Sequence, residues 1–191
     1  MSSHRQRLID EAEGLFGSNG FHAVSLDAIL RAAKTTKTTF YKHFESKDQL
    51  ALICLRNGRD AWWERLDQRL EELGATAPLD RIHGFFQVLG ERFEQDRDSM
   101  ITCFAACGEF PHPTDPCNLA GREGLREIEE RFRTWAAEAG ARDPERLGAQ
   151  LAVAAKGAIL HELAHREGRS AAVAADMAAA MLDQHFEPAQ A

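Results

Sequence analysis

The chain has 191 residues, of which 44% are hydrophobic and 28% are charged. That balance excludes a disordered chain and is typical of one folded domain or of a small module joined to a larger one. No apolar run approaches the roughly 20 residues that cross a bilayer. Because acidic residues interrupt the apolar pattern of residues 1–16, we expect no signal peptide, no membrane partner and a cytoplasmic location.

The formal net charge of −7 is unevenly distributed along the chain. Residues 1–55 contain seven Lys or Arg and six Asp or Glu, whereas the remainder contains sixteen and twenty-four. Within residues 31–47, five basic residues stand against one acid, Glu45. Because a phosphate backbone responds to local charge, this basic segment favours nucleic acid as a partner despite the acidic remainder.

Apolar residues recur at helical spacing along almost the whole chain, and no convincing strand is present. The spacing predicts a first helix whose apolar face ends at Phe16 and which stops near residues 17–20. Ser25 is the expected N-cap of a second helix, and Thr36 is the expected N-cap of a short third helix.

Ser46, with Gln49 three residues later, predicts a capping box that opens a long fourth helix ending at Gly74. Five more helices are expected, two of them opened by an Asp-Pro pair, which combines a cap with the favoured first helical residue. One of these helices is expected to start at Pro78, a short one to lie around Cys103, and a long one to start at Asp115-Pro116. The last two are expected over residues 145–166 and 170–186. The sequence therefore predicts an all-α fold of about nine helices.

Residues 25–44 have the spacing of a helix-turn-helix, in which one helix braces a second that enters the major groove. Phe40 and Phe44 lie four residues apart and are expected to anchor the second helix. The hydroxyls and cations on or near its exposed faces suit base edges and phosphates; they are Lys37, Thr38, Thr39, Tyr41, Lys42 and His43. The alternative is two short capped helices that merely pack together.

The segment KTTKTTFYKHFESKDQL, residues 34–50, resembles the DNA-binding domain of the TetR family of bacterial transcriptional regulators. It has a small-residue turn, a short recognition helix, an aromatic-Tyr-x-His-Phe pattern and Ser-Lys-Asp-x-Leu, and LFGSNGF at residues 15–21 is also similar. The resemblance covers residues 5–53. It implies a three-helix helix-turn-helix DNA-binding domain over residues 1–48, followed by a larger helical ligand-binding and dimerisation domain over residues 49–191.

By this resemblance, Thr36, Lys37, Thr38 and Lys42 would face bases or nearby phosphates. Phosphates would be held by Ser25, Tyr41, His43 and Lys47. The sequence departs from the family pattern in having Lys34 where the turn usually has glycine, Thr35 where valine is frequent, and Thr38 instead of Gly or Ala. These departures bear on which bases are read.

The resemblance also implies a homodimer on a palindromic double-stranded DNA operator, and a ligand-responsive repressor that is not an enzyme and has no cofactor. Activation of transcription is the alternative to repression. Dimerisation would use the last two helices, in which small residues allow close approach: Ala149, Ala152, Ala155, Gly157, Ala158, Ala174, Ala178 and, with them, Met181.

A small hydrophobic effector is expected to bind in the larger domain. The residues that could line its pocket are Trp63, Phe86, Leu89, Phe93, Met100, Cys103 and Phe104. The alternative is that these side chains simply form the core, since aromatic residues at helical spacing usually do so.

The segment HELAH, residues 161–165, has the pattern of zinc metalloproteases, in which two histidines bind the ion and the glutamate activates water. A zinc-dependent hydrolase using His161, Glu162 and His165 is therefore the alternative function. However, Ala171 stands where the longer motif has a third histidine, and the short pattern alone is a weak signal. We favour polar helix-face residues at or beside an interface and assign no metal, with a non-catalytic metal site as the remaining alternative.

Cys103 and Cys107 lie one helical turn apart, and Cys117 follows a proline-rich loop. Small buried hydrophobic side chains are the favoured interpretation of these cysteines. A thiol sensor or a soft-metal site is the alternative.

Overall fold

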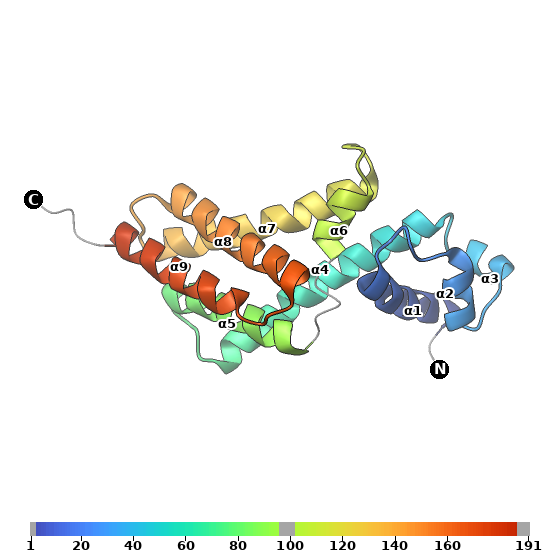
Figure 1. The fold of residues 1–191 in the computed structure, drawn as a ribbon, viewed down its shortest axis with the longest axis horizontal. Coiled ribbons are helices and arrows are strands. Elements are labelled where there is room, and N and C mark those ends of the chain that lie inside the picture. Colours follow the sequence, from blue (N-terminus) through green and yellow to red (C-terminus); the bar gives the residue numbers. More distant parts are fainter. Residues whose placement is uncertain (1–2, 96–101, 187–191) are drawn as a thin grey trace, which may run out of the picture. The chain divides into compact units, whose positions relative to one another are not determined.

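The computed structural model describes residues 3–95 and 102–186 of the chain (Figure 1). Within these ranges it contains nine α-helices and no strand, which confirms the all-α prediction. No helix of the described part is long and apolar enough to cross a membrane. The helices are α1 His4–Asn19, α2 Leu26–Ala32, α3 Lys37–Tyr41, α4 Lys47–Glu72, α5 Pro78–Gln95, α6 Thr102–Glu109, α7 Pro116–Glu138, α8 Pro144–His165 and α9 Ser170–Phe186.

The predicted helix starts follow from local capping contacts. Before α8, the carboxylate of Asp143 accepts a hydrogen bond from the N–H of Arg146 at 3.0 Å. Before α4, Ser46 Oγ accepts from the N–H of Gln49 at 3.0 Å, and the Gln49 side chain accepts from the N–H of Glu45 at 2.7 Å. In the expected capping box, the Gln49 side chain would accept a hydrogen bond from the N–H of Ser46. It accepts from the N–H of Glu45 instead, one residue earlier.

The chain divides into two compact units, the first made of Met1–Trp62 and Asp98–Gly124. Its core combines apolar side chains of α1 to α3, of the first part of α4 and of the segment around α6. The ring of Phe21 lies 5.1 Å from that of Phe16 and 5.6 Å from that of Phe110, measured between centroids. The turn between α1 and α2 therefore packs against the residue that follows α6.

The second unit comprises Trp63–Arg97 and Leu125–Ala191. Its aromatic core is centred on Phe132 of α7, whose ring centroid lies 4.7 Å from that of Phe85 and 5.6 Å from that of Phe86. Trp135 packs edge-on against Phe132 at 5.9 Å. Helix α9 contacts both α8 and α5, so the last two helices are part of this unit's own packing.

Five of the small residues predicted for a contact between two copies face their own chain rather than an outer surface. Ala152, Ala155, Ala158, Ala174 and Ala178 are all buried within the protomer. The small size of these five residues serves the contact between α8 and α9 within the chain. The other residues predicted for a contact between two copies are half-buried Ala149 and Met181 and exposed Gly157. The large apolar side chains that these two helices leave exposed are Val153, Leu160, Val173 and Met177.

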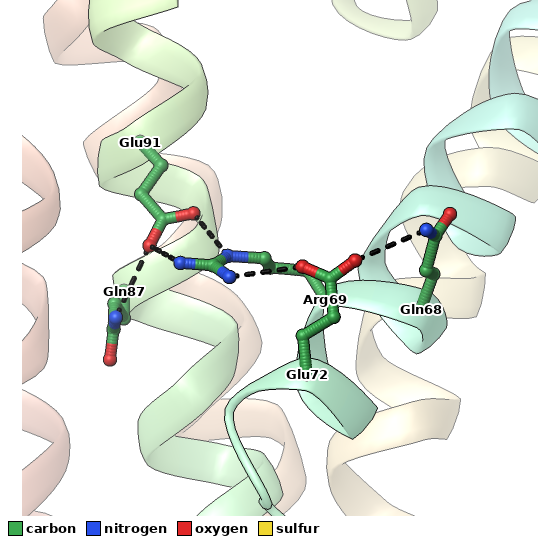
Figure 2. A network of polar contacts seen from close by, with 5 residues as sticks. All are labelled: Gln68, Arg69, Glu72, Gln87 and Glu91. Carbon is green, nitrogen blue, oxygen red and sulfur yellow. Dashed lines mark hydrogen bonds and ion pairs between the residues drawn. The ribbon is translucent and has the colours of Figure 1, made fainter.

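A polar network at the surface joins α4 to α5 within the second unit, with Arg69 and Glu91 half-buried at its centre (Figure 2). Arg69 binds the Glu91 carboxylate through two N–H groups, at 2.8 and 3.1 Å, and donates to Glu72 at 3.0 Å. Gln87 also donates to Glu91 at 3.2 Å, and Gln68 donates to Glu72 at 3.1 Å. The hydrogen bonds from Arg69 lower the pKa of Glu91 below its ordinary value.

Replacing Glu91 by Gln is expected to lower the melting temperature at pH 7 by about 1–3 °C, because ion pairs at a protein surface contribute little. A carboxyl whose pKa is lowered by folding stabilises the protein above its unfolded pKa of about 4.3, and this stabilisation is lost as the pH falls through the folded pKa. Thermal melts at decreasing pH should therefore show the gap between wild type and Glu91→Gln closing below about pH 4. A gap of constant size would contradict the assignment, and Glu94→Gln, an exposed substitution on the same helix, is the control.

Candidate nucleic-acid interface

The turn between α2 and α3 places a non-glycine residue in the left-handed region. Lys34 has a φ of 48°, a conformation that costs an L-residue about 1–2 kcal/mol. The N–H of Thr35 donates to the C=O of Leu30 at 3.0 Å, and the N–H of Lys34 donates to the C=O of Arg31 at 3.2 Å. These bonds close the end of α2 in the manner usually made with glycine, and the exposed Lys34 adds a cation to this surface.

Helix α3 is anchored by two phenylalanines. Phe40 is 0% exposed and Phe44 is 2% exposed, and their ring centroids lie 5.4 Å apart. Thr36 Oγ1 accepts from the N–H of Thr39 at 3.2 Å and caps the helix. Because a five-residue helix is unstable alone, the buried rings and the cap together hold it.

Most of the side chains predicted to contact DNA are exposed to solvent, on α3 and on the residues that flank it and α2. Exposed side chains are those of Ser25, Thr36, Lys37, Thr38, Tyr41, Lys42 and His43, and half-buried ones are those of Thr39 and Lys47. Ser25 also caps α2, where its Oγ accepts from the N–H of Ala28 at 3.2 Å. The hydroxyls and cations expected from the sequence are therefore exposed or half-buried, so that solvent, base edges or phosphates can reach them.

Lys37 has a partner on α2. Its Nζ lies 3.1 Å from Oδ1 of Asp27, and both side chains are more than half exposed. Since exposed ion pairs stabilise a fold by at most about 1 kcal/mol, a phosphate can compete for the Lys37 cation.

Lys47 has a structural contact that the sequence did not predict. Its Nζ donates to the C=O of Phe21 at 2.6 Å and to the C=O of Val24 at 3.0 Å. An ammonium group has three donors, so one remains for a phosphate. Replacing Lys47 would therefore disturb the turn between α1 and α2 as well as remove a charge.

The N–H groups of the same turn bind Glu109, the last residue of α6. Phe21 donates to Glu109 Oε1 at 3.1 Å, His22 donates to Oε2 at 2.6 Å, and His22 Nδ1 lies 3.3 Å from Oε2. Gly20 has a φ of 83°, and a Cβ at this position would lie 2.7 Å from Glu109 Oε1. Only glycine therefore leaves room for this carboxylate. We call the pair of Lys47 and Glu109 the turn clamp.

Arg5 contacts one of the two phenylalanines that anchor α3, although its side chain was not among the predicted site residues. Its guanidinium lies 5.6 Å from the centroid of the Phe44 ring, within the range of a cation–π contact, and the residue is exposed. The available sequence signal was its position at the start of the segment that resembles the family.

The residues expected to line an effector pocket are distributed over both units. Trp63, Phe86, Leu89 and Phe93 belong to the second unit, Cys103 and Phe104 belong to the first, and Met100 lies outside the described residues. Leu89 and Phe93 are 0% and 1% exposed, and Phe86 stacks on Phe132. These three contribute to the core, as the alternative interpretation expected, and their contact with an effector stays a prediction.

Trp63 is one of the half-buried residues of this set. Its indole Nε1 donates to Glu127 at 2.7 Å, and the Arg131 guanidinium lies 4.8 Å from its ring centroid. Arg131 also binds both oxygens of Asp67, at 2.7 and 3.0 Å. Trp63 is thus held within a polar network of the second unit.

Burial raises the pKa of two of the cysteine thiols considered as sensors. The pKa of Cys107 is raised by desolvation, and that of Cys117 is raised to about 12 by desolvation and by the charges of Asp115 and Asp48. Cys117 also donates to the C=O of Asp48 at 3.5 Å. Because a protonated thiol is a weak nucleophile, these environments favour the interpretation of both as packing residues.

The glutamate of HELAH is not available to a zinc hydrolase. Glu162 is 5% exposed and accepts from the N–H of Gly168 at 2.9 and 3.0 Å and from Ser170 Oγ at 2.8 Å. Both carboxylate oxygens therefore hold the turn between α8 and α9. No group of three or more potential metal ligands occurs in the described part of the chain. His161 and His165 are exposed.

Replacing Glu109 by Ala is expected to lower the free energy of unfolding by about 1–2 kcal/mol, because two backbone N–H groups lose a charged acceptor. Amide exchange at Phe21 and His22 should accelerate. The measurement is urea denaturation with hydrogen exchange, and Glu123→Ala, which removes an exposed ion pair with Arg59 in the same unit, is the control. Equal effects of the two substitutions would contradict a specific role of Glu109.

Residues 8–53 match the family described as bacterial regulatory proteins, tetR family. The HTH-type transcriptional repressor KstR2 of Mycolicibacterium smegmatis is 31% identical over 100 residues, which are 52% of this chain and 48% of that protein. The HTH-type transcriptional regulator HbdR of Aromatoleum sp. is 27% identical over 82 residues, which are 43% of this chain and 35% of that protein. The matched region thus spans less than half of the length of either relative.

The fold has a close counterpart among solved structures. A TetR-family transcriptional regulator from Streptomyces coelicolor superposes with a TM-score of 0.87 over 96% of each chain, at 20% identity. Because the two sequences are only 20% identical, this superposition establishes the fold alone. The match over residues 8–53 adds the family that the N-terminal segment matches. The expected resemblance is therefore confirmed: residues 8–53 match the TetR family of bacterial regulatory proteins, in a chain with the fold of TetR-family transcription regulators, which are not enzymes.

Proposed function

We propose that the protein is a homodimeric transcriptional regulator that binds a near-palindromic DNA operator and acts in the cytoplasm as a ligand-responsive repressor. The observation that carries this proposal is the exposed face of hydroxyls and cations on α3, above the buried Phe40 and Phe44. The relative KstR2 is named as a repressor, which supports this direction of regulation.

In the proposed complex, α3 enters the major groove. Thr36, Lys37, Thr38 and Lys42 face bases or nearby phosphates, because hydroxyls and amines donate to base-edge acceptors. Phosphates are bound by Ser25, Tyr41, His43 and Lys47, with Thr39 beside them and Arg5 as an addition from the structure. The intrachain bonds of Lys47 leave it one donor for this purpose.

The second copy is proposed to dock on the exposed apolar side chains of α8 and α9. Val153 is 70% exposed, Leu160 57%, Val173 53% and Met177 47%. A Cβ added to Gly157 would meet no atom within 4 Å, so a neighbouring helix can approach there closely. A two-fold dimer would present two copies of α3 to half-sites about 34–36 Å apart.

A small hydrophobic effector is proposed to bind in the helical part of the chain that follows residue 48, as expected from the sequence. The effector would release DNA by binding one arrangement of the protein better than the other. Glu109 offers a physical connection, because a displacement of α6 would pull on the N–H groups of Phe21 and His22.

DNA recognition can be tested with duplexes selected from a random pool by the full-length protein. Tyr41→Phe should weaken binding about 3- to 10-fold on every duplex, because it removes one hydroxyl from a phosphate contact. Thr38→Val preserves shape and should reduce the preference for the selected over a scrambled duplex at least about fivefold. Fluorescence anisotropy at several salt concentrations measures both effects, with Thr134→Val on α7 as the control. Failure to select any duplex, or affinity that is independent of salt, would refute DNA binding.

Dimerisation can be tested separately by sedimentation. Leu160→Asp should convert the wild-type dimer to a monomer, because it places a charge in the apolar contact. Leu119→Asp is the matched control, since Leu119 is 49% exposed on α7 and should tolerate the same change without dissociation. A monomeric wild-type protein, or a Leu160→Asp variant that associates as tightly as wild type, would contradict the proposed contact.

A further inference from the structure

The two histidines of the HELAH segment form an exposed pair at the end of α8. Their ring centroids lie 4.4 Å apart, with the ring planes inclined by 45°. Residues four apart in a helix project from the same face, so both imidazoles can reach one point in solvent. We propose that His161 and His165 together bind a divalent transition-metal ion through their imidazole nitrogens.

The separation of the rings suits a shared ion. A metal–imidazole bond measures about 2.0–2.1 Å, so the centre of each ring lies roughly 3 Å from the ion. If the two imidazole ligands form an angle of about 90–110° at the ion, their ring centroids lie about 4.5–5 Å apart. The observed 4.4 Å requires only a small rotation of two exposed side chains to reach this arrangement. The rings are adjacent only while the end of α8 is helical, so the ion selects the folded state.

The intervening glutamate does not take part. Both oxygens of Glu162 are occupied by Gly168 N–H and Ser170 Oγ, on the side of α8 that faces the turn to α9. The ion would therefore have no general base from this motif beside it. The site is a binding site, in contrast to the hydrolase that the same five residues suggest.

The chemistry of the donors selects the ion. Imidazole nitrogens suit Zn²⁺, Ni²⁺ and Cu²⁺, whereas Mg²⁺ and Ca²⁺ prefer oxygen ligands. Within the described residues no third His, Cys, Asp or Glu joins a potential metal-binding group. Water would complete the coordination, and binding should be reversible and weaker than at structural sites with three or four protein ligands.

The pair borders the exposed apolar side chains of α8 without being part of them. His161 directly follows Leu160, and one residue is a step of about 100° around a helix. The ion would thus lie at the flank of the surface proposed for the second copy. Its binding does not depend on whether the protein binds DNA.

Titration calorimetry on the tag-free, full-length protein tests the site with NiCl₂ and ZnCl₂, and with MgCl₂ as the comparison ion. One saturable site per chain is expected for Ni²⁺ or Zn²⁺, and none for Mg²⁺. His161→Asn and His165→Asn should each weaken binding at least about tenfold, because loss of even an outer-shell partner weakens metal binding 10- to 100-fold. His83→Asn, at an exposed position on α5, should leave it unchanged.

A second measurement needs no variant. Ni²⁺ added in small amounts to the wild-type protein should broaden the NMR signals of the His161 and His165 rings before those of the other histidines. The assignment would be overturned if no saturable binding is found, or if binding persists when both His161 and His165 are replaced by Asn. It would also be overturned if the broadening starts at other histidines. Each of these results leaves the DNA-binding proposal to its own test.

Discussion

The turn between α1 and α2 is held between two opposite charges, and the recognition surface depends on this turn clamp. Lys47 binds the carbonyl groups of Phe21 and Val24, and Glu109 binds the N–H groups of Phe21 and His22. Partners on both sides of the turn restrict the path by which the chain enters α2. Helix α2 follows this turn directly, and α3, which bears the exposed hydroxyls and cations, comes after the next turn. The position of α3 therefore depends on these polar contacts as well as on its buried rings.

The part of this arrangement that could be predicted from the sequence is local. Caps act over three residues, and Phe40 and Phe44 share a face because they lie one helical turn apart. The left-handed backbone at Lys34 was likewise predictable, because Lys34 stands at the turn position where the pattern of the resembled family usually has glycine. Each of these features depends on neighbours within about five residues, which is the range that spacing describes.

The remainder depends on contacts that spacing does not encode. Glu109 lies 88 residues from Phe21, and no local pattern distinguishes it from the other acidic residues. Lys47 was expected to point only to phosphates because a cation in a basic segment gives no sign of its carbonyl partners. The alanines of α8 and α9 were assigned to a contact between copies, but composition cannot distinguish packing within a chain from packing between chains. The HELAH motif shows the same limit, because its function depends on where Glu162 points.

Hydrogen exchange of the full-length protein, with and without a selected duplex, tests the central claim that α3 and the turn before it form the DNA-binding surface. The account predicts that the duplex slows exchange mainly in residues 25–47, where the exposed hydroxyls and cations lie. Unchanged exchange in this range, with slowing confined to α5, α8 or α9 while the duplex is bound, would contradict it.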